Sequence, residues 1–307
     1  MKKTMCFMAV ILPILFVSCT KKDDQNAVPI ERTPKLAVVS SGGNSWLSFS
    51  DLNEYEETLE SLSDADSLTL ASFEESMSFT SMRTTYNEEE LEEKGIDDEL
   101  LATLLNPDGK IQIGDYVISV DVMADDVAVL SNIDGTEQHF SIDDEVLYIL
   151  FDSVTQSDPI VIDGGISQLM SSTSSERLEQ SIQIACLEQD TVKFKLKYQR
   201  AGIYFSIVVD ARYKMFQRNS LLGWEIKGYN NQYVIGFDAG PGTYTRNRRN
   251  ANQITIPRRI DSGVNRCYTY RPYSKACGLK QFSLSSLFSV YDDEGFSRYF
   301  NANIFRN

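Results

Sequence analysis

Residues 191–198 alternate between apolar and polar side chains, three of them lysines, and this period of two constrains the fold more than any other feature of the chain. Successive side chains of a β-strand point to opposite faces, so the segment predicts a strand with one buried face and one face in water. Similar segments, separated by Gly, Asn, Pro or Asp, follow at 203–216, 229–237, 253–256, 267–273, 281–291 and 298–305. This succession predicts an antiparallel β-sandwich or partial barrel.

The N-terminal half begins with a helical period instead. Helical patterns cover residues 51–62, 69–92 with a break near 78–80, and 97–105. Glu54 follows Asp51 by three positions, as in a capping box, and Gly95 suits the end of the second stretch. The outer faces of these helices are acidic, and each helix carries an apolar stripe.

The period then changes to two over 111–122 and 127–130, which predicts a small antiparallel sheet. The fold class is therefore α+β. We expect an acidic helical layer with a small antiparallel sheet, followed by a β-rich antiparallel region that resembles a sandwich.

The charges divide the chain in the same way. Residues 36–170 contain 30 acidic residues and only three basic ones, whereas residues 171–307 contain 11 acidic and 20 basic residues. We predict an acidic α+β region over 36–170 and a basic β region over 171–307. The asymmetry indicates either a charged partner or packing of the two halves on each other. The net charge of −15 opposes a polyanion, so we expect no nucleic-acid partner.

The N-terminus indicates a lipoprotein. Lys2 and Lys3 precede an apolar run over 5–17, which is shorter than the roughly 20 residues of a membrane-spanning helix. The run ends in Leu15-Phe16-Val17-Ser18-Cys19, which resembles the lipobox of bacterial lipoproteins. The resemblance implies removal of residues 1–18 and attachment of lipid, such as palmitate, to Cys19, whose chains would then hold the protein on a membrane. The alternative is an ordinary secretory signal with an incidental cysteine.

The residues after Cys19 refine the expected location. Thr20-Lys21-Lys22-Asp23-Asp24 is similar to the export signal of Bacteroides-type surface lipoproteins. This resemblance implies an outer-membrane lipoprotein that is exposed on the cell surface. Residues 19–35 are predicted to form a flexible tether. The resemblance is confined to this N-terminal part, so it informs location and not fold.

Three cysteines remain beyond the lipid site: Cys186, Cys267 and Cys277. In an oxidising compartment Cys267 and Cys277 are close enough in sequence to form a disulfide that closes a small loop. The alternative is that all three are buried thiols, since spacing does not establish geometry.

Catalytic and metal-binding patterns are weak. His139 is the only histidine, which excludes multi-histidine metal sites, and its phase opposite to Phe140 predicts a solvent-facing strand position. Residues 106–110 imitate part of an EF-hand loop, but Leu104 would fall at the first ligand position, so we interpret them as a tight turn. Asp210 interrupts an apolar strand and is the nearest candidate for an acid of raised pKa. We predict no catalytic residue, metal site or cofactor.

One segment has the composition of a binding site, because arginines alternate there with tyrosines. Guanidinium groups bind carboxylate or sulfate in a forked geometry, and tyrosine faces stack on sugar rings. The residues are Tyr244, Arg246, Arg248, Arg249, Arg258, Arg259, Arg266, Tyr268, Tyr270, Arg271 and Tyr273. We interpret them as the candidate contact for an acidic glycan or for an envelope or extracellular protein. The alternative is that the arginines face the acidic half or form the wet sides of strands.

These features predict a membrane-anchored surface lipoprotein with a non-catalytic role in binding or adhesion. One alternative is a glycan-directed hydrolase, which needs two carboxylates that face each other in a cleft. Another is a structural component of the envelope, which predicts exposed apolar surface or an unpaired strand edge.

Overall fold

The computed structural model describes residues 36–152, 176–186, 191–213, 216–219, 223–226, 232–246, 252–264 and 266–307. Residues 34–307 form one compact unit. The predicted signal peptide and tether, with Cys19, lie outside the described residues, and so do Arg248 and Arg249. In the described ranges we find no helix with the length and apolar character needed to cross a membrane.

The first sheet, which we call the N-terminal sheet, has six strands in sequence order. They are β1 (Ala37–Ser41), β2 (Asn44–Phe49), β3 (Lys110–Ile113), β4 (Tyr116–Asp121), β5 (Asp126–Ser131) and β6 (Glu137–Phe140). Only β2 and β3 are parallel, because the helices are inserted between them. The predicted strands are present, whereas the hairpin of β1 and β2 was not predicted.

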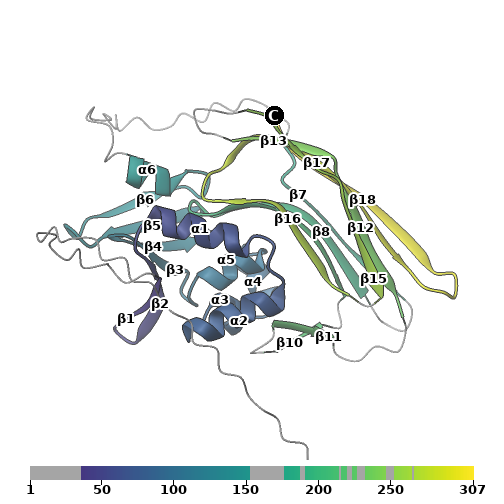
Figure 1. The fold of residues 1–307 in the computed structure, drawn as a ribbon, viewed down its shortest axis with the longest axis horizontal. Coiled ribbons are helices and arrows are strands. Elements are labelled where there is room, and N and C mark those ends of the chain that lie inside the picture. Colours follow the sequence, from purple (N-terminus) through teal and green to yellow (C-terminus); the bar gives the residue numbers. More distant parts are fainter. Residues whose placement is uncertain are drawn as a thin grey trace, which may run out of the picture. The chain divides into compact units, whose positions relative to one another are not determined.

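Five helices follow β2, and a sixth follows β6 (Figure 1). They are α1 (Leu52–Leu62), α2 (Ser67–Met77), α3 (Met82–Thr85), α4 (Glu88–Glu93), α5 (Glu99–Leu104) and α6 (Val146–Asp152). Asp51 caps α1 by accepting a hydrogen bond from the Glu54 amide. The break predicted near 78–80 is confirmed, since Ser78 ends α2 in the left-handed conformation. The helix α6 was not predicted.

Apolar side chains of the helices and the N-terminal sheet form the first core. Leu59 and Leu100 from the helices and Ile111 and Val127 from the sheet are fully buried there. Ile203, in the turn after residue 200, also belongs to this core, and its carbonyl oxygen accepts a hydrogen bond from the Tyr55 hydroxyl. The acidic and basic halves of the chain therefore pack against each other through a common apolar core.

Two further antiparallel sheets form the sandwich. One, which we call the covered sheet, has the order β16 (Tyr268–Lys275), β9 (Phe205–Tyr213), β8 (Thr191–Arg200) and β7 (Glu179–Ala185). The other, which we call the open sheet, contains β12 (Val234–Ala239), β13 (Gly242–Arg246), β14 (Ile254–Ile256), β15 (Arg259–Val264), β17 (Leu279–Tyr291) and β18 (Ser297–Arg306). The remaining strands β10 (Phe216–Asn219) and β11 (Gly223–Ile226) pair with each other. The predicted fold class, α+β with a sandwich-like region, is confirmed.

The inner faces of these two sheets enclose the second core. Phe194 of the covered sheet stacks on Phe288 of the open sheet, with ring centroids 4.9 Å apart. Tyr198 packs against Phe282 at 4.8 Å. Aromatic pairs at this spacing add about 0.5–1.5 kcal/mol to the free energy of burial. Each sheet of the sandwich also has an outer face, and these two outer faces differ completely.

Candidate functional site

The outer face of the covered sheet is charged, yet it is not in water. Lys193, Lys195 and Lys197 alternate with core residues along β8, as the sequence predicts, but Lys195 is only 4% exposed. The prediction of a wet lysine face is therefore wrong. The acidic helices α4 and α5 cover this face (Figure 1), so the basic side chains meet carboxylates in place of water.

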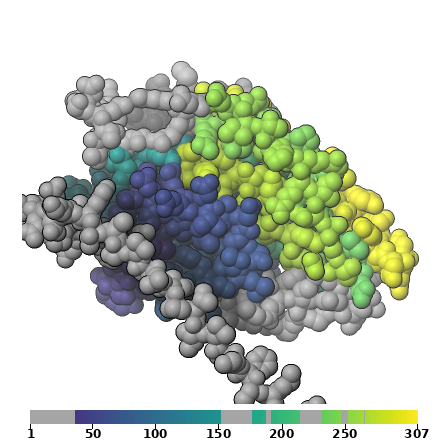
Figure 2. All heavy atoms as spheres, viewed as in Figure 1, coloured from purple at the N-terminus to yellow at the C-terminus, as the bar shows by residue number. Residues whose placement is uncertain are grey.

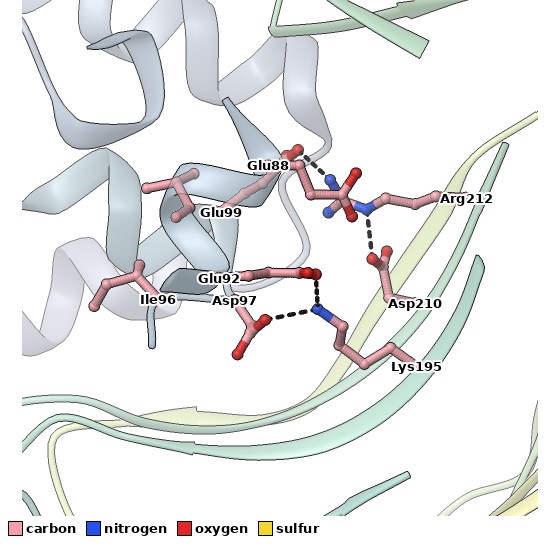
Figure 3. A pocket seen from close by; sticks show the side chains of 9 residues that line it. Glu88, Glu92, Ile96, Asp97, Glu99, Lys195, Asp210 and Arg212 are labelled. Carbon is pink, nitrogen blue, oxygen red and sulfur yellow. Dashed lines mark hydrogen bonds and ion pairs between the residues drawn. The ribbon is translucent and has the colours of Figure 1, made fainter. Parts of the chain in front are cut away.

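Lys195 lies at the centre of these ion pairs (Figure 3). Its Nζ atom lies 2.6 Å from Glu92 Oε1 and 2.6 Å from Asp97 Oδ1. Lys193 also donates to Glu92, and Lys197 donates to Asp97. Three lysines of one strand thus share two carboxylates from the segment that contains α4.

A second group forms around Arg212 of β9. Its Nη1 atom donates to Glu99 Oε1 at 2.9 Å, and its Nε atom donates to Asp210. Asp210 also accepts a hydrogen bond of 2.7 Å from the Thr269 hydroxyl. Asp210 is therefore a buried partner of an arginine, and it does not have the apolar surroundings of a catalytic acid.

The most deeply buried ion pair of the described residues joins Asp98 to Arg271, whose side chains are 0% and 1% exposed. Arg271 Nε donates to Asp98 Oδ1 at 2.7 Å, and the hydroxyls of Tyr204 and Ser206 donate to Oδ2 at 2.7 and 2.6 Å. Asp98 also caps α5 by accepting from the Leu100 amide. One carboxylate therefore ties the start of a helix to two strands of the covered sheet.

These carboxylates are held in the ionised form. Burial by itself raises the pKa of Asp98, but Arg271 and the two hydroxyls outweigh it, so the pKa lies below its ordinary value. Burial likewise opposes ionisation of Glu99, and Arg212 and Ser67 reverse that effect, so its pKa is lowered too. The same balance lowers the pKa of Asp97 through Lys195 and Lys197. A general acid for glycan hydrolysis needs a raised pKa, so these groups do not suit that role.

A small cavity lies among these ion pairs. Its volume is about 10 Å³, close to the room for one water molecule. Its walls are charged and aliphatic, without the aromatic side chains of a sugar site; the lining residues are Glu88, Leu91, Glu92, Ile96, Asp97, Glu99, Lys195, Asp210 and Arg212. The cavity is a gap in a structural network of charges.

The predicted arginine and tyrosine patch does not form one surface. Arg271 is buried in its pair with Asp98, so its assignment to a ligand-binding surface is wrong. Tyr270 is 8% exposed, and its ring is stacked on Phe237, with the guanidinium of Arg259 lying 4.7 Å from its centroid. Because the Tyr270 ring packs in the sandwich core, it is not available to stack on a sugar.

The other described members of the patch lie in separate places. Arg258 is exposed and binds Asp238 through two nitrogens. Tyr268 is half-buried and meets Phe237 edge-on. At the far end of β16, the half-buried Tyr244 packs edge-on against the core residue Tyr273. Arg246 is also half-buried. Tyr268 and Tyr273 are five residues apart along β16, so the two groups are separated by roughly 17 Å.

The predicted disulfide is also wrong. Cys267 and Cys277 are both free thiols. Cys267 immediately precedes β16 and Cys277 lies two residues after it, so an extended strand holds them apart. A disulfide needs Cα atoms within about 7 Å, whereas eight strand residues span roughly 25 Å. Burial raises the pKa of the Cys267 thiol well above its usual range, which keeps it protonated.

The outer face of the open sheet is, in contrast, exposed and largely uncharged. Ile260 is 60% exposed and Tyr299 65% exposed, and Val264, Leu287 and Tyr291 are exposed as well. Val264 lies opposite Val234, which lies opposite Tyr291, so these three side chains form a row across the sheet. In Figure 2 the C-terminal strands, green to yellow, lie at the surface beside the blue helical layer. We call the outward side chains of β15, β12, β17 and β18 the open face.

One signal in the sequence points to the open face. In β17 the buried phase runs through Phe282, Leu284 and Phe288, while the outward phase is mainly serine. Leu287 and Tyr291 occupy the outward phase, where the alternation predicts polar residues. Apolar residues in the water-facing phase of a strand indicate a contact surface. Both residues lie in the segment 281–291, which the sequence predicts as a strand without a binding role.

The remaining candidates occupy ordinary positions. His139 is exposed, as predicted, and its Nδ1 atom lies 2.9 Å from Asp126 Oδ1. Asn106 forms the predicted tight turn, since its Oδ1 atom accepts from the amides of Asp108 and Lys110. Within the described ranges, no three His, Cys, Asp or Glu side chains gather in the manner of a metal site.

Comparisons with known proteins add little to this geometry. No family model matches the chain, and no curated protein matches it. The chain is similar to the crystal structure of a DUF4848 family protein from Bacteroides thetaiotaomicron, with 14% identity over 88% of this chain and 100% of that one. The TM-score of this match is 0.22.

Proposed function

We propose that this protein is a lipid-anchored surface lipoprotein that binds an external glycan or protein without transforming it. The open face carries the proposal. Scattered surface apolar residues are common, but exposed apolar side chains in the outward phase of four neighbouring strands are typical of a contact surface. The lipid on Cys19, predicted from the lipobox resemblance, would keep the protein on a membrane.

The charges of the covered sheet support a binding role over hydrolysis. Lys195 forms an internal ion pair with Asp97, and Arg212 forms one with Glu99. The pKa values of Asp97, Asp98 and Glu99 are lowered. A hydrolase that uses paired carboxylates would need a protonated one near neutral pH. The open face offers contact area in place of such a pair.

The test compares binding by the full-length protein, extracted in detergent, with binding by variants on glycan and extracellular-protein arrays. We expect Ile260→Glu with Leu287→Glu to abolish binding, since each change removes an exposed apolar side chain and adds a negative charge to the open face. The exposed Ile133, between β5 and β6, supplies the matched control: Ile133→Glu should bind as the unchanged protein does.

A second variant tests the arginine segment. Arg246, Arg248 and Arg249 are changed together to Ser, and binding should persist because the open face is intact. If this variant loses binding while the open-face variant keeps it, the contact lies in the arginine segment and the proposal is overturned. Absence of binding to any array member would also overturn it. The anchor is tested separately: Cys19→Ser should move the protein from the membrane fraction to the soluble fraction.

A further inference from the structure

We infer that the ligand of the open face is an uncharged polysaccharide, which lies as an extended chain across the strands. This inference rests on the proposed function, since it specifies the ligand of the same surface. Three observations carry it: the near absence of charge, the hydroxyl and amide groups that surround the apolar side chains, and the arrangement of two exposed tyrosines beside a row of small residues.

The open face is almost free of charge although the chain carries a net charge of −15. Among the outward positions of β15, β12, β17 and β18, only Asp238 is ionisable at neutral pH, and Arg258 already binds it through two nitrogens. Arg259 has the opposite phase in β15 and lies over Tyr270. An acidic ligand would find no unengaged guanidinium on the face, so its charge would go unpaired.

Polar groups on the open face are of the kind that bind sugar hydroxyls. Serine hydroxyls and side-chain amides each donate and accept hydrogen bonds, as sugar hydroxyls do. Those that lie at outward and exposed positions are Ser262, Gln281, Ser283, Ser285, Asn301 and Asn303. Protein-binding surfaces are also enriched in tyrosine, but they are enriched in arginine and methionine as well and depleted in serine. The composition therefore favours a glycan over a protein.

Two tyrosines provide apolar rings for stacking. Tyr299 of β18 lies opposite Ser289, and Tyr291 of β17 lies opposite Ser297, so the two tyrosines are diagonal neighbours on adjacent strands. Diagonal neighbours of this kind are about 7–8 Å apart at their Cα atoms. Both rings are exposed, and tyrosine combines an apolar ring with a polar hydroxyl, which suits a ligand that is both apolar and hydroxylated.

A row of small residues extends from Tyr299 across the sheet. Ser289 lies opposite both Tyr299 and Gly236, and Gly236 lies opposite Ser262. A Cβ atom on Gly236 would lie 2.6 Å from the Asp261 carbonyl oxygen and 2.7 Å from Ser262 Cβ, so the backbones approach where only glycine fits. Larger side chains line both sides of the row, with Val234 on one side and Leu287 on the other. A row of this kind accommodates a chain of sugar rings better than one small sugar.

Titration calorimetry on the detergent-extracted full-length protein tests the inference. The probes are three neutral polysaccharides, namely glycogen, mixed-linkage β-glucan and galactomannan, and two acidic ones, polygalacturonate and heparin. We expect at least one neutral polysaccharide to bind and both acidic ones to fail. Tyr299→Ala should weaken binding about tenfold, the effect of removing one central aromatic contact.

Two further variants separate stacking from other roles. Tyr299→Phe keeps the ring and should bind within about twofold of the unchanged protein, which a role of the hydroxyl alone would not permit. Ser289→Trp fills the row of small residues and should abolish binding, with thermal unfolding used to show that the variant is folded. Ile133→Ala is the control for a general loss of exposed apolar surface.

The outcomes distinguish this inference from the proposed function. Binding of an acidic polysaccharide, or of an array protein and no neutral polysaccharide, through the open face would overturn the inference and leave the proposed function standing. Formation of a dimer that Ile260→Glu with Leu287→Glu disrupts, without glycan binding, would assign the face to a second copy and also overturn it. Neutral polysaccharide binding that all open-face variants retain would overturn both.

Discussion

The two outer faces of the sandwich invert the usual relation between polarity and exposure. The covered sheet presents lysines, arginines and acids, and these side chains are buried or half-buried. The open sheet presents leucine, isoleucine, valine and tyrosine, and these are exposed. The difference shows that burial of a strand face depends on what packs against it. The acidic helices neutralise the covered face, whereas no described element covers the open face.

The largest effect is expected at Asp98, the centre of the buried charges. Asp98→Ala leaves Arg271 buried without its partner and also removes the α5 cap, so we expect a loss of about 3–5 kcal/mol in the free energy of unfolding. Urea denaturation measures this loss. Adding Arg271→Met to Asp98→Ala should restore part of the stability, because no unpaired charge then remains. A double variant less stable than the single one would contradict this account.

Lys195→Met should cost less, about 1.5–3 kcal/mol, the range for hydrogen bonds to charged groups. The reason is that Glu92 keeps Lys193 and Asp97 keeps Lys197 when Lys195 is removed. The same urea experiment measures the change. A loss as large as that of Asp98→Ala would show that the lysine row depends on Lys195 alone.

The buried charges also predict the dependence of stability on pH. Asp97, Asp98 and Glu99 have lowered pKa values in the folded protein. Their stabilising contribution is present above the unfolded pKa values of about 4 and is lost as the pH falls through the folded ones. We expect the midpoint of thermal unfolding to fall steeply below about pH 4. Asp98→Asn should flatten that dependence, and an unchanged slope would exclude Asp98 as a source.

On the open face, Leu287→Ser should change the free energy of unfolding by no more than about 0.5 kcal/mol, as is usual for exposed positions. This apolar substitution should thus cost less than the removal of the charge of Lys195, which is the reverse of what residue type alone suggests. Urea denaturation of both variants under one set of conditions makes the comparison. A larger loss for Leu287→Ser would mean that another part of the chain covers the face.

The smallest effect concerns the exposed pair of His139 and Asp126. A hydrogen bond from Asp126 and its negative charge raise the pKa of His139 above its ordinary value. Titration followed by NMR should show this rise in the unchanged protein and its loss in Asp126→Asn. An equal pKa in both proteins would show that the pair does not persist in solution. Asp126→Asn should leave the unfolding midpoint at neutral pH unchanged, since the pair is exposed.

The sequence by itself determined the elements whose periodicity is local. The period of two in 191–198 predicts β8, the spacing of Asp51 and Glu54 predicts the start of α1, and the outward phase of His139 predicts its exposure. These outcomes depend on side-chain direction and on hydrogen bonds within a few residues, which neighbouring residues specify. The α+β class follows from the order of such elements.

Only the tertiary structure decided which faces are covered and which charges are paired. Asp98 and Arg271 are separated by more than 170 residues, and Lys195 by about 100 from Asp97, so no local pattern relates them. Cys267 and Cys277 are close in sequence but lie at opposite ends of an extended strand. Alternation specifies that a strand has two faces. Packing between distant segments decides whether each of these two faces contacts water or another part of the protein.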